Sequence, residues 1–357
     1  MCIRDSIRRE HLTDCRCLIV RTVTRVDADL LNGTPVEFVG TATIGTDHID
    51  LDYLAEADIG CSNAAGCNAE AASEYVISGL FALAQRKGFD PFKLKAGIVG
   101  FGNVGSRLHQ KLDTLGIACL VCDPPLQEAG TSHQDFVDLD TILQKCNFVT
   151  LHVPLTRGGR HPTYHLLDAG RLKHLQQGCL LVNAARGEVV DNRALLELLN
   201  KRGDLLVFLD TWEHEPKLSL ELLQRVDLAT PHIAGYSVEG RLRGTQMVLD
   251  AACKHFKLKS SWHMSQQLPA DKVLELQHSD SVAKAWHDLF RQHFDIWRDH
   301  EALISGSEMD PKSFAVHFDA LRRVYLDRLE YERFIVQPKN SGIPVQAIQQ
   351  LGFQIGT

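Results

Sequence analysis

The stretch KAGIVGFGNVGSRLHQKLDTLG, residues 95–116, decides the fold of this chain. It opens with a short apolar run, passes through a glycine-rich turn and continues with helix-forming residues at apolar spacing. Gly100, Gly102 and Gly105 make the pattern G-x-G-x-x-G. Such a pattern also occurs by chance, but here it follows a predicted strand and opens a predicted helix over 104–115. The stretch therefore predicts a βαβ unit whose turn binds a dinucleotide.

Each glycine of this turn has a separate structural role. The first glycine permits the tight turn, the second lets the backbone approach a pyrophosphate, and the third lets helix and strand pack closely. The N-terminus of the helix, at Asn103 and Val104, presents unpaired N–H groups to the phosphates. Asp123 stands eighteen residues after Gly105, at the end of the next predicted strand. Its carboxylate can accept hydrogen bonds from ribose hydroxyls and would repel the extra phosphate of NADP, so the predicted cofactor is NAD. The alternative is that Asp123 only ends a strand before Pro124.

Strands and helices alternate on both sides of this stretch. Upstream, apolar runs predict three strands, followed by a helix over 69–87 with apolar spacing. Downstream, further strand and helix segments alternate as far as the short strand in 227–235. This alternation predicts an α/β fold with two doubly wound parallel-sheet lobes of the Rossmann or flavodoxin-like type. From residue 257 a polar linker leads to a helix-then-strand pattern, which predicts a small C-terminal α+β domain.

Composition excludes several classes of protein. The net charge of −7 disfavours a nucleic-acid partner, because such a protein needs a basic face. No apolar stretch reaches the roughly 18 residues that a membrane span requires, and the charged N-terminus is not a signal peptide. Ten scattered cysteines indicate reduced thiols in a cytoplasmic protein rather than a disulfide framework. Cys119 and Cys122 form C-x-x-C inside an apolar run, where core packing is favoured over a metal or redox role.

Three polar stretches follow predicted strands of the NAD-binding part, at the edge where ligands lie in such sheets. In 183–187, Arg186 could hold a carboxylate with both arms of its guanidinium, or it could pair with Asp191 to cap the next helix. The stretch 210–216 holds three acids. Pro231 precedes His232, which is a candidate proton acceptor or a histidine that merely closes a strand.

These three stretches resemble the D-isomer-specific 2-hydroxyacid dehydrogenases, in which an Arg, a Glu and a His make the site in that chain order. The resemblance covers nearly the whole chain up to about residue 256, and it includes 63–68 and Glu74 of the segment between the domains. It implies that His232 takes the proton of the C2 hydroxyl while the hydride leaves for the nicotinamide ring. Glu215 would hold the imidazole and favour its protonated form, and Arg186 would fix the substrate carboxylate.

The resemblance also implies binding residues. The expected cofactor contacts beyond the glycine turn and Asp123 are Val153, Ala184, Ala185, Arg186, Asp210 and Gly235. The motifs around these positions are most similar to those of family members that act on a phosphorylated four-carbon 2-hydroxy acid and carry a C-terminal dimerisation domain. By match to those motifs, Thr22, Thr43 and Tyr236 would contact the substrate, because hydroxyls suit its polar end. Val153 departs from the family, which often has Thr there.

The expected domains follow from the same likeness. Residues 1–91 and 232–256 would form the substrate domain, 92–231 the NAD-binding domain and 257–357 the dimerisation domain of a homodimer. Family members open with a strand and a helix before the segment that matches 17–23. The opening MCIRDSIRREHLTDC fits neither, so we expect the substrate domain to lack its first strand and to be less stable for it.

Other functions stay open at this point. Another phosphorylated 2-hydroxy acid, such as 3-phosphoglycerate, shares the carboxylate, the C2 hydroxyl and the phosphate. A non-catalytic NAD-sensing protein on the same scaffold is the alternative from another class, although all three catalytic positions are present. The C-terminal domain could also bind an effector, but it shows no glycine loop or ligand cluster, which favours a dimer interface.

Overall fold

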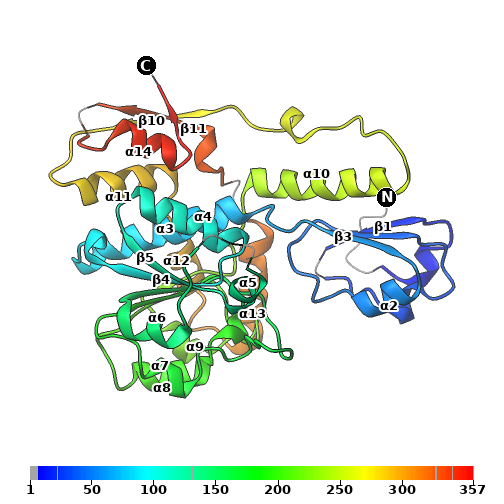
Figure 1. Cartoon of the computed structure of the whole chain (residues 1–357), viewed down its shortest axis with the longest axis horizontal. Coiled ribbons are helices and arrows are strands. Elements are labelled where there is room, and N and C mark those ends of the chain that lie inside the picture. The colour runs from blue at the N-terminus through cyan, green and yellow to red at the C-terminus, as the bar shows by residue number, and fades with distance from the viewer. Residues whose placement is uncertain are drawn as a thin grey trace. The chain divides into compact units, whose positions relative to one another are not determined.

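The computed structural model describes residues 7–21, 23–130, 132, 134–325, 328–339 and 341–356. The chain divides into two compact units, one of residues 1–69 with 237–269 and one of 70–236 with 270–357 (Figure 1). These compact units group the residues differently from the domains expected from the sequence, which stay a prediction. The helix α3 (Ala69–Lys87) and the C-terminal segment both belong to the unit that holds the glycine turn.

The first unit is built on a small parallel sheet in the order β1-β2-β3. Its strands are β1 (Cys17–Val20), β2 (Phe38–Thr41) and β3 (Gly60–Asn63), shorter than the three predicted ones but at the same places. The helices α1 (Ala28–Leu31), α2 (Leu51–Glu56) and α10 (Val238–His255) complete it. α10 packs directly on the sheet, since a Cβ added at Gly40 would lie 2.4 Å from Cγ1 of Val248.

The second unit is built on a six-stranded sheet in which all pairs of neighbours are parallel, in the order β5-β4-β6-β7-β8-β9. The strands are β4 (Lys95–Val99), β5 (Ala118–Cys122), β6 (Phe148–Leu151), β7 (Leu180–Asn183), β8 (Leu206–Leu209) and β9 (Leu228–Ala229). The chain goes outward from β4 to β5 and then crosses back to β6. The doubly wound prediction is confirmed for this sheet, and its switch point, where such folds bind ligands, lies between β4 and β6.

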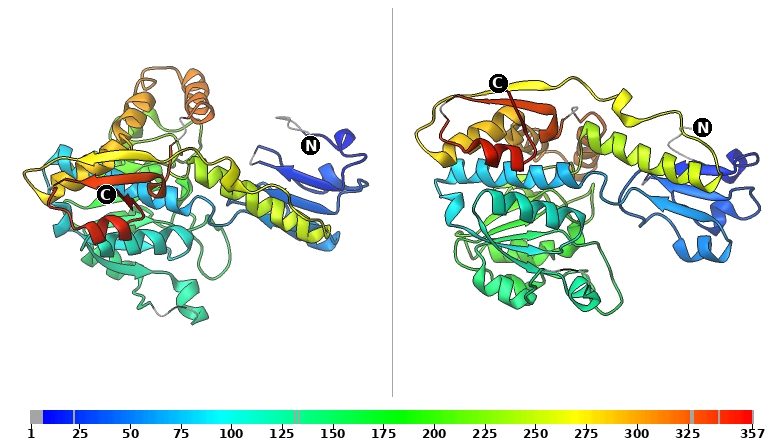
Figure 2. Two further views of the ribbon diagram at one scale, coloured as in Figure 1. Left: turned by 90° about the horizontal axis from the view of Figure 1, so that it is seen from above. Right: turned by 45° about the horizontal axis from the view of Figure 1, so that its top comes forward.

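Helices cover both faces of this sheet. α3 and α4 (Asn103–Thr114) lie on one face, and α6 (Leu139–Lys145), α7 (Ala169–Leu172), α8 (Asn192–Leu199) and α9 (Leu220–Leu223) on the other (Figure 1 and the right view of Figure 2). The short α5 (Pro124–Ala129) follows β5. Strands buried on both faces read as continuous apolar runs, which is why the segments that form them were recognisable in the sequence. The predicted helices over 69–87 and 104–115 are confirmed, the second with a shift of one residue.

The C-terminal segment forms a second small parallel sheet, β10-β11-β12, with four helices. The strands are β10 (Lys272–Leu276), β11 (Phe334–Pro338) and β12 (Gln354–Ile355), and the helices are α11 (Val282–His293), α12 (Ile296–Ile304), α13 (Pro311–Arg323) and α14 (Val345–Gln350). The helix-then-strand pattern of the sequence corresponds to α13 and β11, whereas β10, α11 and α12 were not predicted. In the described part of the chain, no helix has the length and apolar character needed to cross a membrane.

Aromatic rings join this segment to α3. Phe290 of α11 lies edge-on to Phe81 of α3, with ring centroids 5.0 Å apart, and stacks on Tyr331 at 5.8 Å. Such pairs add about 0.5–1.5 kcal/mol each beyond the burial of their surface. A polar contact joins the same elements, because the backbone N–H of Tyr331 donates to the buried carboxylate of Glu74, 3.1 Å away. The C-terminal segment is therefore part of the core of the second unit.

Candidate active site

The glycine turn has the geometry that a pyrophosphate requires. Gly100 has a φ of +93°, and a Cβ there would lie 2.6 Å from the carbonyl oxygen of His152. A Cβ at Gly105 would lie 1.9 Å from the carbonyl oxygen of Gly100, so helix α4 meets the turn too closely for any side chain. Gly102 faces open space, since nothing lies within 4 Å of a Cβ added there. A side chain at Gly100 or Gly105 would thus clash with neighbouring backbone atoms. The open space at Gly102 leaves room for a ligand.

The N-terminus of α4 is free of a side-chain cap. Gly102 is the N-cap residue and supplies no side chain, so the first N–H groups of a twelve-residue helix point out of the turn. Unpaired N–H groups at helix N-termini can hold phosphates, which makes this turn a candidate phosphate site. Asn103 begins the helix and Val104 follows it, so the helix starts one residue earlier than the sequence predicted. The turn therefore fits the pyrophosphate of a dinucleotide on its own geometry.

Asp123 ends β5 and lies against the turn. Its Oδ2 accepts from the N–H of Phe101 at 2.7 Å, and its Oδ1 accepts from Leu126 N as the N-cap of α5. The two readings of this residue are therefore compatible, because Asp123 caps a helix and also places its carboxylate beside the glycine turn. Val153, which follows β6, lies next to the same turn, with Cγ1 2.9 Å from a Cβ built on Gly100. The binding roles of both residues stay predictions.

Asp210 organises the loop that carries the candidate proton acceptor. This carboxylate ends β8 and is 1% exposed. Its Oδ1 accepts from Thr230 Oγ1 at 2.7 Å and from Ile233 N at 2.9 Å, and its Oδ2 accepts from Ala234 N at 3.0 Å. The backbone carbonyl of Asp210 accepts from the N–H of His232 at 2.7 Å. One aspartate thus fixes both sides of His232.

His232 stands at a sharp turn. Its φ of +55° lies in the left-handed region, which non-glycine residues adopt rarely and which recurs at functional sites. Its Nδ1 lies 2.7 Å from Oε2 of Glu215. The other carboxylate oxygen of Glu215, Oε1, accepts from Trp212 N at 2.9 Å. Because the carboxylate engages Nδ1, Nε2 is the ring nitrogen that can exchange a proton with a substrate.

The charge of Glu215 is stabilised by its partners. Burial raises the pKa of this carboxyl, but the His232 imidazolium, the hydrogen bonds and the more distant Arg322 lower it, and the net effect is a pKa below the ordinary 4.5. Glu215 is therefore an anion through the neutral range. A fixed anion against Nδ1 stabilises the imidazolium that forms when Nε2 takes a proton. Of the three acids in 210–216, the structure joins Glu215 to His232.

Arg186 follows β7 in a loop held by a buried side chain. Asn183 is fully buried; its amide nitrogen donates to the carbonyl of Arg186 at 2.9 Å, and its Oδ1 accepts from Ala185 N at 3.1 Å. Ala184 and Ala185 come between these two positions, and Arg186 is half-buried. Asp191 caps α8 through its own Oδ1, which accepts from Ala194 N, so that cap does not depend on Arg186.

The loop after β7 and the loop after β8 are packed backbone to backbone. A Cβ at Gly187 would lie 2.0 Å from the carbonyl group of Trp212. Glu213 adds polar contacts, because its Oε2 accepts from Asn192 N at 2.8 Å and its Oε1 lies 2.7 Å from Nε2 of His165. The loops that carry Arg186 and Glu215 are thus held together. No sequence motif singles out Glu213 or His165 for this contact.

A buried arginine from the C-terminal segment holds the His232 loop from its other side. Arg328 is 6% exposed, and its Nε donates to the carbonyl of Tyr236 at 3.0 Å. Its Nη2 donates to the carbonyls of Ala234 and, at 3.3 Å, of Ala71 in α3. Gly235, a predicted cofactor contact, lies between two of these carbonyls. No motif marked Arg328 in the sequence.

Tyr236, a predicted substrate contact, meets the same segment with its side chain. Its hydroxyl accepts from Nη2 of Arg322 at 3.4 Å, and its ring lies edge-on to Tyr325 at 5.9 Å. The other two predicted substrate residues are elsewhere. Thr43 is in the first unit, where its hydroxyl lies 2.7 Å from that of Thr41. Thr22 lies outside the described residues.

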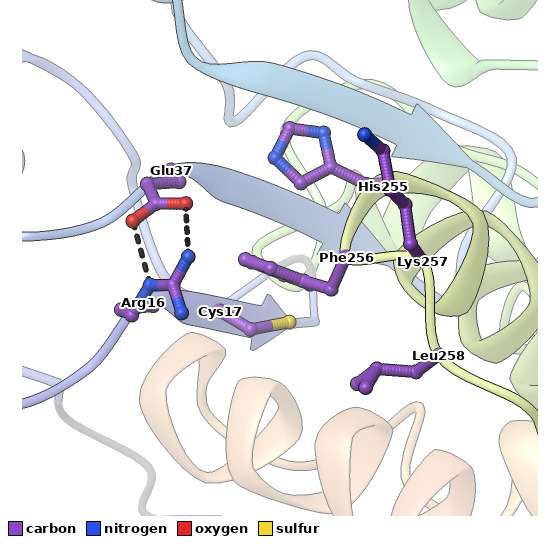
Figure 3. A pocket seen from close by; sticks show the side chains of 7 residues that line it. All are labelled: Arg16, Cys17, Glu37, His255, Phe256, Lys257 and Leu258. Carbon is purple, nitrogen blue, oxygen red and sulfur yellow. Dashed lines mark hydrogen bonds and ion pairs between the residues drawn. The ribbon is translucent and has the colours of Figure 1, made fainter.

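Desolvation favours the uncharged forms of His152 and of the two cysteines in the C-x-x-C motif. His152 is half-buried, and the desolvation of its ring lowers its pKa to about 3, so it stays neutral. Burial raises the pKa of Cys119 and Cys122 to about 12, which fits core packing. Figure 3 shows a hollow of the first unit with none of the predicted catalytic residues in its lining. There the guanidinium of Arg16 is already paired with Glu37 at 2.6 and 2.7 Å (Figure 3).

Known proteins resemble this chain over most of its length. Residues 65–234 match the family model of the D-isomer specific 2-hydroxyacid dehydrogenase NAD binding domain. The erythronate-4-phosphate dehydrogenase of Chromohalobacter salexigens is 44% identical over 350 residues, which are 95% of this chain and 88% of that protein. The enzyme of the same name from Sodalis glossinidius is 45% identical over 338 residues, or 94% of this chain and 88% of its own.

Solved structures are also similar to this chain. The NAD⁺-bound 3-phosphoglycerate dehydrogenase of Entamoeba histolytica superposes with a TM-score of 0.59 at 25% identity, over 70% of this chain and 82% of that one. A formate dehydrogenase of Staphylococcus aureus in complex with NAD shares the fold, with a TM-score of 0.56 at 24% identity over 72% and 83% of the two chains. The matched domain is the family's NAD-binding domain, and it contains the glycine turn, Asp123, Arg186, Glu215 and His232. This chain belongs to the D-isomer-specific 2-hydroxyacid dehydrogenases, on the branch of the erythronate-4-phosphate dehydrogenases.

Proposed function

We propose that this protein oxidises 4-phospho-D-erythronate to (R)-3-hydroxy-2-oxo-4-phosphooxybutanoate with NAD, as a step of pyridoxal 5'-phosphate biosynthesis. The curated relatives are erythronate-4-phosphate dehydrogenases that match nearly the whole chain, which supports this substrate. The observation that carries the chemistry is the pairing of His232 Nδ1 with Glu215 at 2.7 Å, on a loop of the NAD-binding unit. The family and its domain make NAD the cofactor.

The reaction needs a base for the hydroxyl proton of C2. His232 takes this proton at Nε2, and the electron pair of the breaking O–H bond forms the new carbonyl as the hydrogen on C2 leaves with its bonding electrons. Bound NAD supplies the nicotinamide ring that accepts this hydride. Glu215 stabilises the charge that the imidazole gains. The helix N-terminus at Gly102 and the carboxylate of Asp123 hold the dinucleotide by its phosphates and ribose.

The substrate must also be oriented. Arg186 binds the C1 carboxylate with its planar guanidinium, which fixes the C2–H bond toward the ring. The loop positions of Ala184, Ala185, Val153, Asp210 and Gly235 border the cofactor in this proposal. Thr22, Thr43 and Tyr236 supply hydroxyls for the remaining oxygens of the substrate.

We also propose that the chain acts as a homodimer through residues 257–357, in the cytoplasm. This segment carries most of the large apolar side chains that the described surface exposes, including Leu258, Val273, Val316 and Val324 at 65%, 55%, 71% and 73%. Large apolar side chains exposed to water are common at protein interfaces. The described cysteines are free thiols, as is usual in a reducing compartment.

The decisive experiment offers the purified protein NAD with 4-phosphoerythronate and, separately, with 3-phosphoglycerate, and follows NADH absorbance. We expect turnover of the four-carbon substrate and its loss by on the order of 100-fold or more in His232→Ala. His174→Ala, at an exposed histidine of the same unit, is the matched control and should keep full activity. Turnover of 3-phosphoglycerate alone would reassign the substrate. A folded, NAD-binding protein that oxidises neither acid would refute the catalytic proposal.

A further inference from the structure

Arg322 brings a positive charge from the C-terminal segment to the site residues. It lies in the last turn of α13 and is half-buried. Its Nη2 donates to the hydroxyl of Tyr236 at 3.4 Å, and its guanidinium carbon lies 5.9 Å from the ring centre of Phe318. Its Nε is buried and has no hydrogen-bond partner among the described residues. A guanidinium carries five N–H donors, so most of the hydrogen-bonding capacity of this group is available to a ligand.

The charge of Arg322 is maintained where it lies. Burial opposes the charge, but the nearby oxygens of Tyr236, Glu215 and Asp319 raise the pKa of this guanidinium above its ordinary value. Among the described contacts, the carboxylate of Glu215 meets Nδ1 of His232 and the N–H of Trp212, and it makes no direct hydrogen bond to Arg322. A buried N–H donor without an acceptor, such as Nε of Arg322, destabilises the protein. An anionic ligand that accepts a hydrogen bond from this donor would remove that cost.

We propose that Arg322, together with the hydroxyl of Tyr236, binds the phosphate group of the substrate and so determines specificity for a phosphorylated hydroxy acid. This inference rests on the proposed function and assigns a residue to its phosphate end. The planar fork of arginine matches phosphate oxygens with paired hydrogen bonds. Arg186, on the loop after β7, serves the carboxylate, so the two anionic groups of the substrate are recognised by arginines from different elements. The C-terminal segment then contributes directly to substrate choice.

The test compares two substrates that differ only in the phosphate, 4-phosphoerythronate and erythronate, in steady-state kinetics with saturating NAD. In Arg322→Ala we expect kcat/KM for 4-phosphoerythronate to fall on the order of 100-fold, mainly through KM, because one charged, bidentate partner is lost. The value for erythronate should stay within about twofold of wild type. Arg322→Lys should recover part of the loss, since it keeps the charge without the fork. Arg323→Ala, the exposed neighbour on α13, is the matched control.

Two results would overturn the proposal. Equal losses for both substrates in Arg322→Ala, with an unchanged melting temperature, would show that the residue supports the site in general and does not select phosphate. Unchanged kinetics with 4-phosphoerythronate would show that the phosphate is bound elsewhere. If the wild-type protein oxidises neither substrate, the proposed function fails by itself. Calorimetric titration with inorganic phosphate then tests Arg322 alone, since wild type should bind phosphate and Arg322→Ala should bind it at least tenfold more weakly.

Discussion

The pairing of His232 with Glu215 links backbone geometry to chemistry at the scale of single residues. The left-handed φ of His232 is held by hydrogen bonds to Asp210 on both sides of it, and this conformation directs Nδ1 to the carboxylate. The folded pKa of Glu215 lies below its ordinary 4.5. The stability that comes from this shift is therefore complete above about pH 4.5 and is lost as the pH falls through the folded pKa.

Glu215→Gln removes the charge and keeps the shape. We expect kcat to fall on the order of 100-fold, because a neutral amide no longer stabilises the imidazolium that forms during hydride transfer. The measurement is kcat between pH 5 and 9, with melting temperatures recorded at each pH.

A comparison with Glu221→Gln, an exposed glutamate of α9, controls for a general change of surface charge. If Glu215→Gln keeps wild-type kcat, the carboxylate only supports the loop. Melting temperatures add an independent check. The loss of stability on going from wild type to the variant should be present at pH 7 and should shrink as the pH falls below about 4.5.

At the scale of elements, the loop 232–236 is fixed by an arginine that follows α13. Arg328 donates to the carbonyls of Ala234, Tyr236 and Ala71, and its guanidinium carbon lies 4.5 Å from the ring centre of Tyr75. Replacing it with methionine keeps the apolar stem and leaves these buried carbonyls without their donor. Each orphaned acceptor costs about 1–3 kcal/mol, so we expect a loss of several kcal/mol of stability in Arg328→Met.

A purely structural role and a positioning role give different kinetics for Arg328→Met. If the arginine positions His232, kcat should drop about tenfold or more at temperatures far below the melting point of the variant, because small displacements of a catalytic group are costly. Activity with 4-phosphoerythronate at 15 °C, together with circular dichroism to show that the protein is folded, provides the measurement. A folded variant with wild-type kcat would mean that Arg328 contributes only stability.

The helices and turns that have a local sequence pattern could be predicted. The long-range contacts that have no such pattern were missed. The helix over 69–87 and the glycine turn were recognisable because apolar spacing and glycine positions are written along the chain. Arg328 reaches backbone carbonyls more than ninety residues away, and any residue supplies a carbonyl, so no partner position is marked. The helices α11 and α12 have aspartate or serine N-caps and amphipathic spacing, and a systematic search for those signals would have found them.

The whole molecule is expected to be a dimer whose interface lies on the C-terminal segment. Val316 of α13 and Val324 just after it are 71% and 73% exposed, and Val273 on the edge strand β10 is 55% exposed. Water-exposed valines on one segment favour association, at roughly 25 cal/mol for each Å² of apolar surface that becomes buried. This segment also carries Arg322, which contacts Tyr236, and Arg328, which contacts the His232 loop. A second chain that packs on the segment would therefore hold both arginines in place.

Sedimentation velocity over a hundredfold range of concentration tests this arrangement. We expect a species of about twice the chain mass of 39.8 kDa for the wild type, and a shift to the monomer mass for the double variant Val316→Asp and Val324→Asp. Val23→Asp, at an equally exposed valine of the first unit, should remain a dimer. In the dissociated double variant, we expect activity with 4-phosphoerythronate to fall together with the dimer fraction. A wild type that is monomeric at every concentration contradicts the proposal, and a double variant that remains dimeric moves the interface away from α13.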